Sequence, residues 1–265
     1  MLTGISLEEA VSRMTAPLSP LGAEALPLER ALGRTLAADV TAPLDQPPFD
    51  RSPLDGYALR AADTAGACRE HPAVLEVADT LYAGDEANIP VKPGQAVRIM
   101  TGAMLPPGCD CVVAQEDTDL GSPVRVFAPV EPRQNYVCQG EDYRKDSLLL
   151  KAGARLDAAA LGVLASAGLT EAEVCRRPRV GLLTTGDEVV SPGTPRPAGK
   201  IYGANGVLLA ARLAELGFET ETAHRGDAPA AVAEVMAELL NSCDVLLTTG
   251  GGSVGDRDIF HQALP

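Results

Sequence analysis

The sequence predicts a multidomain α/β protein, in which a helical linker domain with an inserted small β domain is followed by a partial three-layer α/β domain with a mostly parallel sheet. Three observations lead to this class. The chain has 265 residues, enough for about two domains. Short β-prone runs fill its middle, and strand and helix patterns alternate after Pro178. Its 46% hydrophobic and 22% charged residues are typical of globular proteins that bury a core.

The N-terminal part predicts helical segments and then a loop. Ser6-Leu7-Glu8-Glu9 forms a capping box, and apolar residues follow at helical spacing until Pro17, which predicts an amphipathic helix. The pattern from Pro27 to Val40 predicts a second helical piece. Prolines then interrupt regular structure, so we expect residues 43–54 to form an ordered loop or a boundary.

The middle of the chain predicts a small β domain. Between Ala58 and Tyr143, β-prone runs alternate with Gly and Pro turns. These runs are Ala73–Val77, Ala96–Met100, Cys111–Gln115 and Val124–Pro129. Helix is expected again from Arg155 to Gly168, with Asp157 as its N-cap and Gly168 at its C-terminal cap.

The last part predicts βαβ units and a parallel sheet. The expected strands are Val180–Thr185, Phe218–Ala223 and Val245–Thr249, and the expected helices are Gly206–Leu216 and Ala228–Leu240. Asp227 precedes the second helix as its expected N-cap. We therefore expect three domains: a helical linker domain at 1–48 plus 145–177, an inserted β domain at 49–144, and an α/β domain at 178–265.

Charge and targeting patterns narrow the function classes. The chain has 22 Lys and Arg against 36 Asp and Glu, a net charge of −14, which argues against nucleic acid or anionic membrane as the main partner. Cations or metal-bound ligands fit better. Residues 1–14 lack a signal-peptide pattern, and no apolar run reaches the roughly 20 residues of a membrane span, so we expect a soluble cytoplasmic protein. The six cysteines form no Cys-x-x-Cys pair and are expected to be reduced structural thiols.

A glycine-rich run and several carboxylates follow the expected parallel strands. Residues 250–256 come directly after a strand, so their backbone amides can surround a phosphate, although such a turn is structural about as often. Because parallel strands end at one edge of a sheet, the nearby carboxylates should meet at the same edge. These are Asp187, Glu188, Asp227, Asp256 and Asp258. Together they suit Mg²⁺, which takes one or two carboxylates and completes its shell with phosphate and water; helix capping is the alternative for Asp227.

Three polar segments in the first half have either a turn or a functional interpretation. They are residues 50–58, 101–103 and 140–142. Asp-Gly and Thr-Gly are common turn dipeptides, so both interpretations stay open from the residues alone.

Taken together, these segments resemble the molybdenum insertase family, the molybdopterin molybdenumtransferases of the MoeA and gephyrin E-domain type. Residues 47–58 resemble P-x-x-D-x-S-x-x-D-G-[YF]-A, and residues 99–110 resemble I-x-T-G-A…P-x-G-[AC]-[DE]. Residues 140–142, 185–189 and 250–258 repeat G-E-D, [ST]-T-G-D-E-[LV] and S-G-G-x-S-V-G-x-x-D in the same order. Five ordered motifs over essentially the whole chain make the resemblance specific.

The resemblance implies an enzyme that inserts molybdate into adenylylated molybdopterin with Mg²⁺ and releases AMP. It implies a homodimer whose site lies between the β domain of one subunit and the molybdopterin-binding α/β domain of the other, with a molybdopterin adenylyltransferase as a further partner. By position it assigns catalytic roles to Asp55, Thr101 and Asp142, with Thr101 donating to an oxyanion, and Mg²⁺ binding to Glu188, Asp227 and Asp258. The cofactor-binding positions are Thr185, Gly186, Asp187, Asn205, Gly250, Gly251, Gly252 and Ser253.

The chain departs from the family pattern at three places. Residues 135–139 replace the arginines that usually precede G-E-D, residues 202–205 read Tyr-Gly-Ala-Asn in place of Y-D-x-N, and the chain stops at Pro265. The last departure implies a truncated member without the lysine-bearing segments and the C-terminal β domain. Two other functions stay open: a non-catalytic molybdopterin-binding or scaffold dimer, and a molybdopterin adenylyltransferase-like enzyme.

Overall fold

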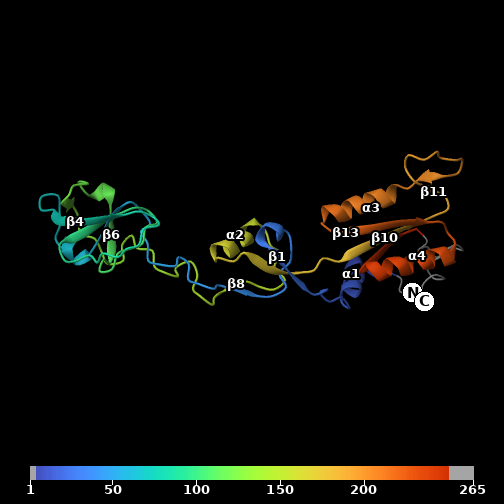
Figure 1. The fold of residues 1–265 in the computed structure, drawn as a ribbon, viewed down its shortest axis with the longest axis horizontal. Coiled ribbons are helices and arrows are strands. Elements are labelled where there is room, and N and C mark those ends of the chain that lie inside the picture. Colours follow the sequence, from blue (N-terminus) through green and yellow to red (C-terminus); the bar gives the residue numbers. More distant parts are fainter. Residues whose placement is uncertain (1–3, 251–265) are drawn as a thin grey trace. The chain divides into compact units, whose positions relative to one another are not determined.

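The computed structural model describes residues 4–250. The chain forms two compact units, one from residues 25–174 and the other from residues up to Glu24 together with those from Cys175 onward (Figure 1). The described part of residues 1–24 therefore belongs to the same unit as the residues from Cys175 onward. The sequence analysis had assigned it to the linker domain. One reason for the observed grouping is a backbone hydrogen bond from Arg176 to Gly22, which joins the two chain segments at 3.0 Å. The boundaries expected near residues 49 and 144 stay a prediction.

A five-stranded sheet is the centre of the β region in the 25–174 unit. Its order is β6-β3-β5-β4-β7, and only β4 and β5 run parallel. The strands are β3 (Gly56–Leu59), β4 (Ala73–Leu81), β5 (Gln95–Ile99), β6 (Cys111–Ala114) and β7 (Val124–Val126). Four of them confirm the predicted runs. The sequence analysis missed β3, whose four residues are all buried and show no polar alternation.

Side chains of β3 alternate between two apolar clusters, as the period of a strand requires. Tyr57 and Leu59 pack on one side with Val124, whereas Ala58 packs on the other with Ile99. Tyr57 is only 1% exposed. Burying each large apolar side chain of this kind contributes about 1.5–3 kcal/mol, so β3 is a major source of the unit's stability.

The linker part of the same unit contains one α-helix and two small sheets. Its elements are β1 (Ala23–Pro27) paired with β9 (Glu171–Cys175), β2 (Val40–Thr41) paired with β8 (Leu148–Leu150), and α2 (Ala158–Ser166). Asp157 caps α2 by accepting from Ala160 N, as predicted. The helix predicted at 27–40 is wrong, because only the 3₁₀ turn Leu28–Arg30 forms. Gly33 then adopts a φ of +72°, and Leu36 donates its backbone N–H to Ala154 and is buried beside Leu28.

A parallel three-stranded sheet forms the core of the other unit. Its order is β13-β10-β14, and both outer strands pair in parallel with β10. The strands are β10 (Arg179–Thr185), β13 (Glu219–Arg225) and β14 (Val245–Thr249), with a small parallel pair of β11 (Val189–Val190) and β12 (Ile201–Tyr202). The helices are α1 (Leu7–Thr15), α3 (Ala204–Glu215) and α4 (Pro229–Ser242). Figure 1 shows α3 and α4 on opposite faces of the sheet.

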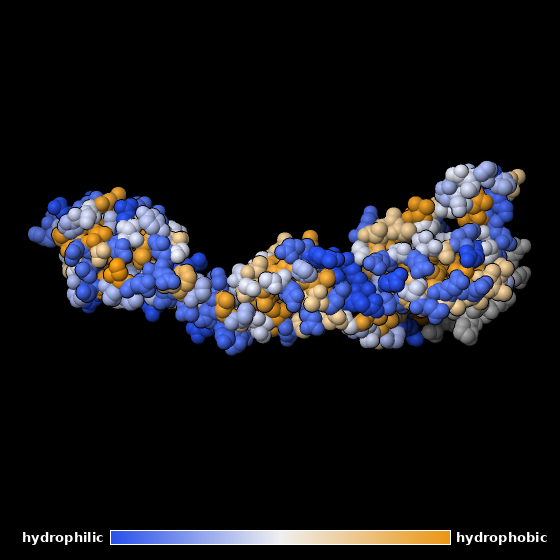
Figure 2. All heavy atoms as spheres, in the orientation of Figure 1, coloured by the Kyte–Doolittle hydropathy of each residue, from blue (hydrophilic) through white to orange (hydrophobic). Residues whose placement is uncertain are grey.

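The two faces of this sheet differ in how closely they are packed. Leu183 of β10 is fully buried against Val232, Val235 and other apolar residues of α4. On the α3 side, Val207 and Leu208 are 62% and 63% exposed, and Figure 2 shows apolar side chains gathered over α3.

The ends of two helices follow different rules. Ser6 caps α1 by accepting from Glu9 N, which confirms the predicted capping box as the start of that helix. Asp227, however, does not cap α4. The N-cap position is Ala228, without a side-chain cap bond, and Pro229 begins the helix because a proline needs no N–H there. Among the described residues, no helix combines the length and the apolar character that a membrane span requires.

Candidate functional site

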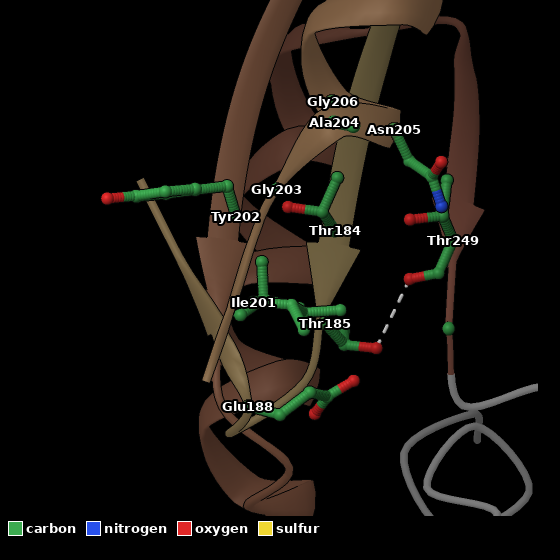
Figure 3. Close-up of a pocket in the computed structure, with 12 residues that line it drawn as sticks. Thr184, Thr185, Glu188, Ile201, Tyr202, Gly203, Ala204, Asn205, Gly206 and Thr249 are labelled. Atoms are coloured by element: carbon green, nitrogen blue, oxygen red, sulfur yellow. Dashed lines mark hydrogen bonds between the residues drawn. The ribbon is translucent and has the colours of Figure 1, made fainter. Parts of the chain in front are cut away.

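A pocket opens at the carboxyl ends of β10 and β14, where the parallel sheet was expected to bind its ligand (Figure 3). Its volume is about 260 Å³. The pocket is lined by Thr184, Thr185, Glu188, Val189, Ile201, Tyr202, Gly203, Ala204, Asn205, Gly206, Thr249 and Gly250. Four predicted site residues, Thr185, Glu188, Asn205 and Gly250, therefore lie at one place.

The ends of β10 and β14 approach each other closely at this pocket. Thr185 Oγ1 donates to the carbonyl oxygen of Thr249 at 3.2 Å, the dashed line in Figure 3. Gly250 follows with a φ of +86°, and a Cβ on it would lie 2.7 Å from Thr185 Oγ1. Only glycine fits this conformation and spacing without strain. Gly250 therefore lets the chain turn away from β14 directly beside the pocket.

The N-terminus of α3 forms the opposite wall. Gly203 is its N-cap and makes no side-chain cap bond, and Ala204, Asn205 and Gly206 of the first turn line the pocket. First-turn N–H groups have no partner within a helix and carry the positive end of its dipole. This wall therefore has the character of an anion-binding surface, to which the Asn205 amide adds both donor and acceptor groups.

The carboxylate of Glu188 is the only acidic side chain that lines the described part of the pocket. It folds back over Gly186, whose φ is +134° and on which a Cβ would lie 2.7 Å from Glu188 Oε2. No described residue donates a hydrogen bond to this carboxylate. Its oxygens are consequently available to a ligand or a cation.

Asp187 and Asp227 form a reciprocal pair instead of lining the pocket. Asp187 N donates to Asp227 Oδ2 at 3.2 Å, and Asp227 N donates to Asp187 Oδ1 at 3.1 Å. The ammonium of Lys200 also donates to the Asp187 carbonyl oxygen. These bonds join the loops that follow β10 and β13 and so fix the segment that carries Glu188.

The remaining predicted positions of this unit lie outside the described residues. They are Gly251, Gly252, Ser253 and Asp258. Within residues 4–250, no group of three or more His, Cys, Asp and Glu side chains has an arrangement that would hold a metal ion. Of the three carboxylates predicted to bind Mg²⁺, only those of Glu188 and Asp227 belong to the described residues.

Asp55 and Thr101 meet in the other unit. Antiparallel pairing of Gly56 with Ile99 places the residue before β3 beside the residues after β5. Asp55 Oδ1 accepts from Thr101 N at 2.8 Å and from Thr101 Oγ1 at 2.7 Å. These bonds, the backbone one first, hold the pKa of Asp55 below its ordinary value. Both donors of Thr101 are thus committed to Asp55, and the expected donation from Thr101 to an oxyanion would require one of them to be released.

Asp142 is not joined to this pair by any hydrogen bond among the described residues. Its backbone N–H donates to the Gln46 carbonyl oxygen at 2.9 Å, and its side chain is exposed. The structure therefore joins two of the three predicted catalytic residues by hydrogen bonds, whereas Asp142 stays a predicted site residue without such a bond to them.

Arg133 supplies positive charge beside the segment that lacks the family's arginines. Its guanidinium lies 4.5 Å from the centre of the Tyr136 ring and donates to Cys138 Sγ at 3.2 Å. The sequence analysis did not single out Arg133, because it precedes the motif rather than occupying it.

The six cysteines all lie within the described residues. All six are free thiols. Burial, together with the charge of Asp110, raises the pKa of Cys109 to about 12 and also raises that of Cys111. Both shifts favour the protonated thiol.

The sequence analysis assigned no role to several other residues of the pocket, although most lie in segments that it named. Val189 belongs to the motif at 185–189, and Tyr202, Gly203 and Ala204 belong to the segment 202–205. Thr184 and Thr249 lie at the ends of the predicted strands, and Gly206 is the first residue of a predicted helix. Only Ile201 carries no such signal, because a two-residue strand is too short to show a pattern.

Comparison with known proteins gives consistent matches. The family model described as "MoeA N-terminal region (domain I and II)" matches residues 5–168, and "Probable molybdopterin binding domain" matches residues 181–265. The chain is 36% identical over 259 residues to molybdopterin molybdenumtransferase 2 of Mycobacterium tuberculosis, and 34% identical over 261 residues to the molybdopterin molybdenumtransferase of Staphylococcus aureus. Each alignment covers 97% of this chain, but 63% and 62% of the relative.

A solved structure matches as well. The crystal structure of the molybdopterin biosynthesis MoeA protein from Pyrococcus horikoshii OT3 has a TM-score of 0.84 and 32% sequence identity. That match covers 92% of this chain and 65% of the other. The chain thus spans about 63% of the length of the first curated relatives.

Proposed function

The chain belongs to the MoeA family, and from that premise we propose that it inserts molybdate into adenylylated molybdopterin, forming molybdenum cofactor and releasing AMP. The observation that carries the proposal is the pocket at the ends of β10 and β14, within the residues that match the molybdopterin-binding domain. The relatives named molybdopterin molybdenumtransferase are longer than this chain, so its activity, substrates and partners are all part of the proposal.

In this proposal the pocket binds the phosphorylated pterin. The first-turn N–H groups of α3 hold the phosphate groups, because a helix N-terminus favours anions. The hydroxyls of Thr185 and Thr249 and the amide of Asn205 hydrogen-bond the polar edge of the pterin ring. Gly250 keeps this end of the sheet open; the predicted cofactor-binding positions Gly251, Gly252 and Ser253 follow it in the sequence and lie outside the described residues.

The carboxylate of Asp55 accepts hydrogen bonds from the reacting groups of the substrate. Thr101 fixes its orientation through two hydrogen bonds, and the same bonds favour its charged form by lowering its pKa. Asp142 acts as the third polar residue of this part of the site. Because these residues and the pocket belong to different units of the chain, the proposed reaction needs both.

Mg²⁺ fits the acidic side chains of the described site. Within residues 4–250 no group donates a hydrogen bond to the Glu188 carboxylate, and Asp187 N donates to only one of the two Asp227 carboxylate oxygens. An ion that takes one or two carboxylates and completes its shell with phosphate and water needs no larger protein cage. We therefore propose Glu188 and Asp227, with Asp258, as its ligands; the ion would neutralise charge on the substrate phosphates.

The proposal includes a homodimer with a site shared between subunits, cytoplasmic location, and a molybdopterin adenylyltransferase that supplies the substrate. Large apolar side chains on α1 support a protein interface, since Leu7 and Met14 are 75% and 73% exposed. Size-exclusion chromatography with light scattering should give twice the monomer mass. A monomer at micromolar concentration would contradict the shared site.

Release of AMP from adenylylated molybdopterin, measured with and without molybdate, tests the proposed activity. We expect release that depends on molybdate and is lost in Asn205→Ala. The matched variant Asn241→Ala, on an exposed position of α4 away from the pocket, should retain it. Binding without release would indicate a scaffold, and adenylyl transfer to unmodified molybdopterin would indicate an adenylyltransferase; either result contradicts the insertase.

A further inference from the structure

An extended segment, residues 46–52, lies between two parts of the proposed site in the 25–174 unit. Its Arg51 pairs antiparallel with Met104 on one side and with Val137 on the other. With Val137 it exchanges two backbone hydrogen bonds, at 3.0 and 3.1 Å. The segment is therefore joined both to the loop that follows β5 and to the chain that leads into the G-E-D motif.

One end of this segment leads to Asp55 and Thr101. Ser52 is only 1% exposed, and its carbonyl oxygen accepts from Gly102 N at 2.8 Å, which holds the residue after Thr101. Ser52 Oγ donates to the Leu54 carbonyl oxygen at 2.6 Å, one residue before Asp55. A shift of the segment would therefore move the hydrogen-bonded pair of Asp55 and Thr101.

The other end of the segment holds Asp142. Gln46 pairs antiparallel with Tyr143, and its carbonyl oxygen accepts from Asp142 N at 2.9 Å. Among the described residues Asp142 makes no direct hydrogen bond to Asp55 or Thr101. The same short segment nevertheless holds all three predicted catalytic residues, so its position decides how they are placed.

The carboxylate of Asp50 fixes this arrangement through both of its oxygens. Oδ2 accepts from Tyr136 OH at 2.5 Å, and Oδ1 accepts from Gln139 N at 2.8 Å, so the two donors lie on either side of Val137. The Tyr136 ring packs against the same apolar cluster as Leu54. Burial, and next the bond to Asp50, raise the pKa of the Tyr136 hydroxyl, which favours its donor form.

We propose that Tyr136 is a positioning residue, which acts through Asp50 to hold the predicted catalytic residues in place relative to one another. This inference rests on the proposed function, which assigns reaction roles to Asp55, Thr101 and Asp142. Loosening the contact between Tyr136 and Asp50 should lower kcat, because a misplacement of about 1 Å can cost about a hundredfold in rate. The KM for adenylylated molybdopterin should not change, since the pterin pocket belongs to the other unit.

Steady-state AMP release in the presence of molybdate, measured in Tyr136→Phe, tests this role. The substitution removes one hydroxyl and keeps the ring on the apolar cluster. We expect kcat to fall about tenfold or more with an unchanged KM. The matched control is Tyr82→Phe, because Tyr82 is 59% exposed in the same unit and its hydroxyl has no hydrogen-bond partner among the described residues. Both kinetic constants of the control should equal those of the wild type.

Two substitutions of Asp50 separate positioning from chemistry. In Asp50→Asn the side-chain oxygen can still accept from Gln139 N, and the NH₂ group can donate to the Tyr136 hydroxyl. Asp50→Leu has a similar volume and can form neither bond. We therefore expect Asp50→Asn to keep kcat near that of the wild type, whereas Asp50→Leu should lose at least as much as Tyr136→Phe. An equal loss in the two Asp50 variants would show that the charge itself is required and would overturn the positioning role.

Hydrogen exchange followed by mass spectrometry reports on the same contacts without depending on activity. In Tyr136→Phe and Asp50→Leu, the backbone amides of residues 136–142 should exchange faster than in the wild type, whereas those of β10 in the other unit should not change. Unaltered exchange in both variants, or faster exchange with an unaltered kcat, would overturn the proposal. A wild-type protein without molybdate-dependent AMP release would instead contradict the insertase, and the exchange result alone would then decide whether Tyr136 and Asp50 hold this segment.

Discussion

Replacing Gly56 with alanine should destabilise the 25–174 unit by about 3 kcal/mol. β3 runs through the buried centre of the sheet, and a Cβ on Gly56 would overlap the backbone carbonyl oxygen of Val113 on β6. Since that oxygen belongs to a paired strand, relief requires the two strands to separate. Overpacking costs about 1–3 kcal/mol, and each strained ladder hydrogen bond adds about 1 kcal/mol.

The matched control is Gly162→Ala in α2 of the same unit. No atom lies within 4 Å of a Cβ built there, and its φ is not positive. Replacing a helical glycine with alanine should stabilise the unit by about 0.5–1 kcal/mol. The two variants therefore make the same chemical change with opposite expected signs.

Differential scanning calorimetry measures both effects. At about 2–4 °C per kcal/mol for a unit of this size, Gly56→Ala should lower the melting temperature by about 6–12 °C, whereas Gly162→Ala should raise it slightly. A Gly56→Ala protein that melts within about 2 °C of the wild type would refute the close-approach reasoning. The glycine of the D-G-Y-A motif would then need a functional rather than a packing explanation.

Three further predictions concern charged residues. Asp55→Asn and Asp142→Asn should keep the melting temperature, since Asn at position 55 still accepts from Thr101 and residue 142 is exposed. Both variants should nevertheless lose molybdate-dependent AMP release. Normal release in both would contradict their proposed roles. In Glu188→Gln, calorimetry should show nucleotide binding that no longer strengthens when Mg²⁺ is added; an undiminished Mg²⁺ effect would remove Glu188 from the metal site. The pKa of Asp244 lies below its ordinary value of 3.8, chiefly because the Arg176 side chain donates hydrogen bonds to it and also because the Arg179 backbone does. Asp244 therefore stabilises its unit at pH values above 3.8, and this contribution is lost as the pH falls through the lowered pKa. Thermal melts should therefore show Asp244→Asn less stable than the wild type at neutral pH and equal to it in strong acid, and a constant difference would show that charge is not the cause.

Local signals in the sequence were sufficient for the elements that position the pocket. Val245–Thr249 is bounded as predicted, and β10 differs from its prediction by one residue, because each strand contains a short apolar run that ends at a turn signal. The caps at Ser6 and Asp157 also follow from a few adjacent residues. Thr185 and Gly250 could be placed in the site because both lie at ends of such strands.

Contacts between distant segments could not be predicted in the same way. Asp227 has the spacing of an N-cap, but its carboxylate accepts from Asp187, forty positions away, and tertiary pairing overrides the local preference. The apolar residues from Leu28 to Leu36 have near-helical spacing, yet Gly33 ends the turn and Leu36 pairs with another segment. β3 is so short that only its position between β5 and β6 identifies it as a strand.

The central claim is that the phosphorylated pterin binds where β10, β14 and the start of α3 meet. A crystal structure of the chain with adenylylated molybdopterin tests it most directly. We expect the ligand to contact Thr185 and Asn205, with its phosphates at the first turn of α3. A ligand bound elsewhere, with this pocket holding only solvent, would contradict the account.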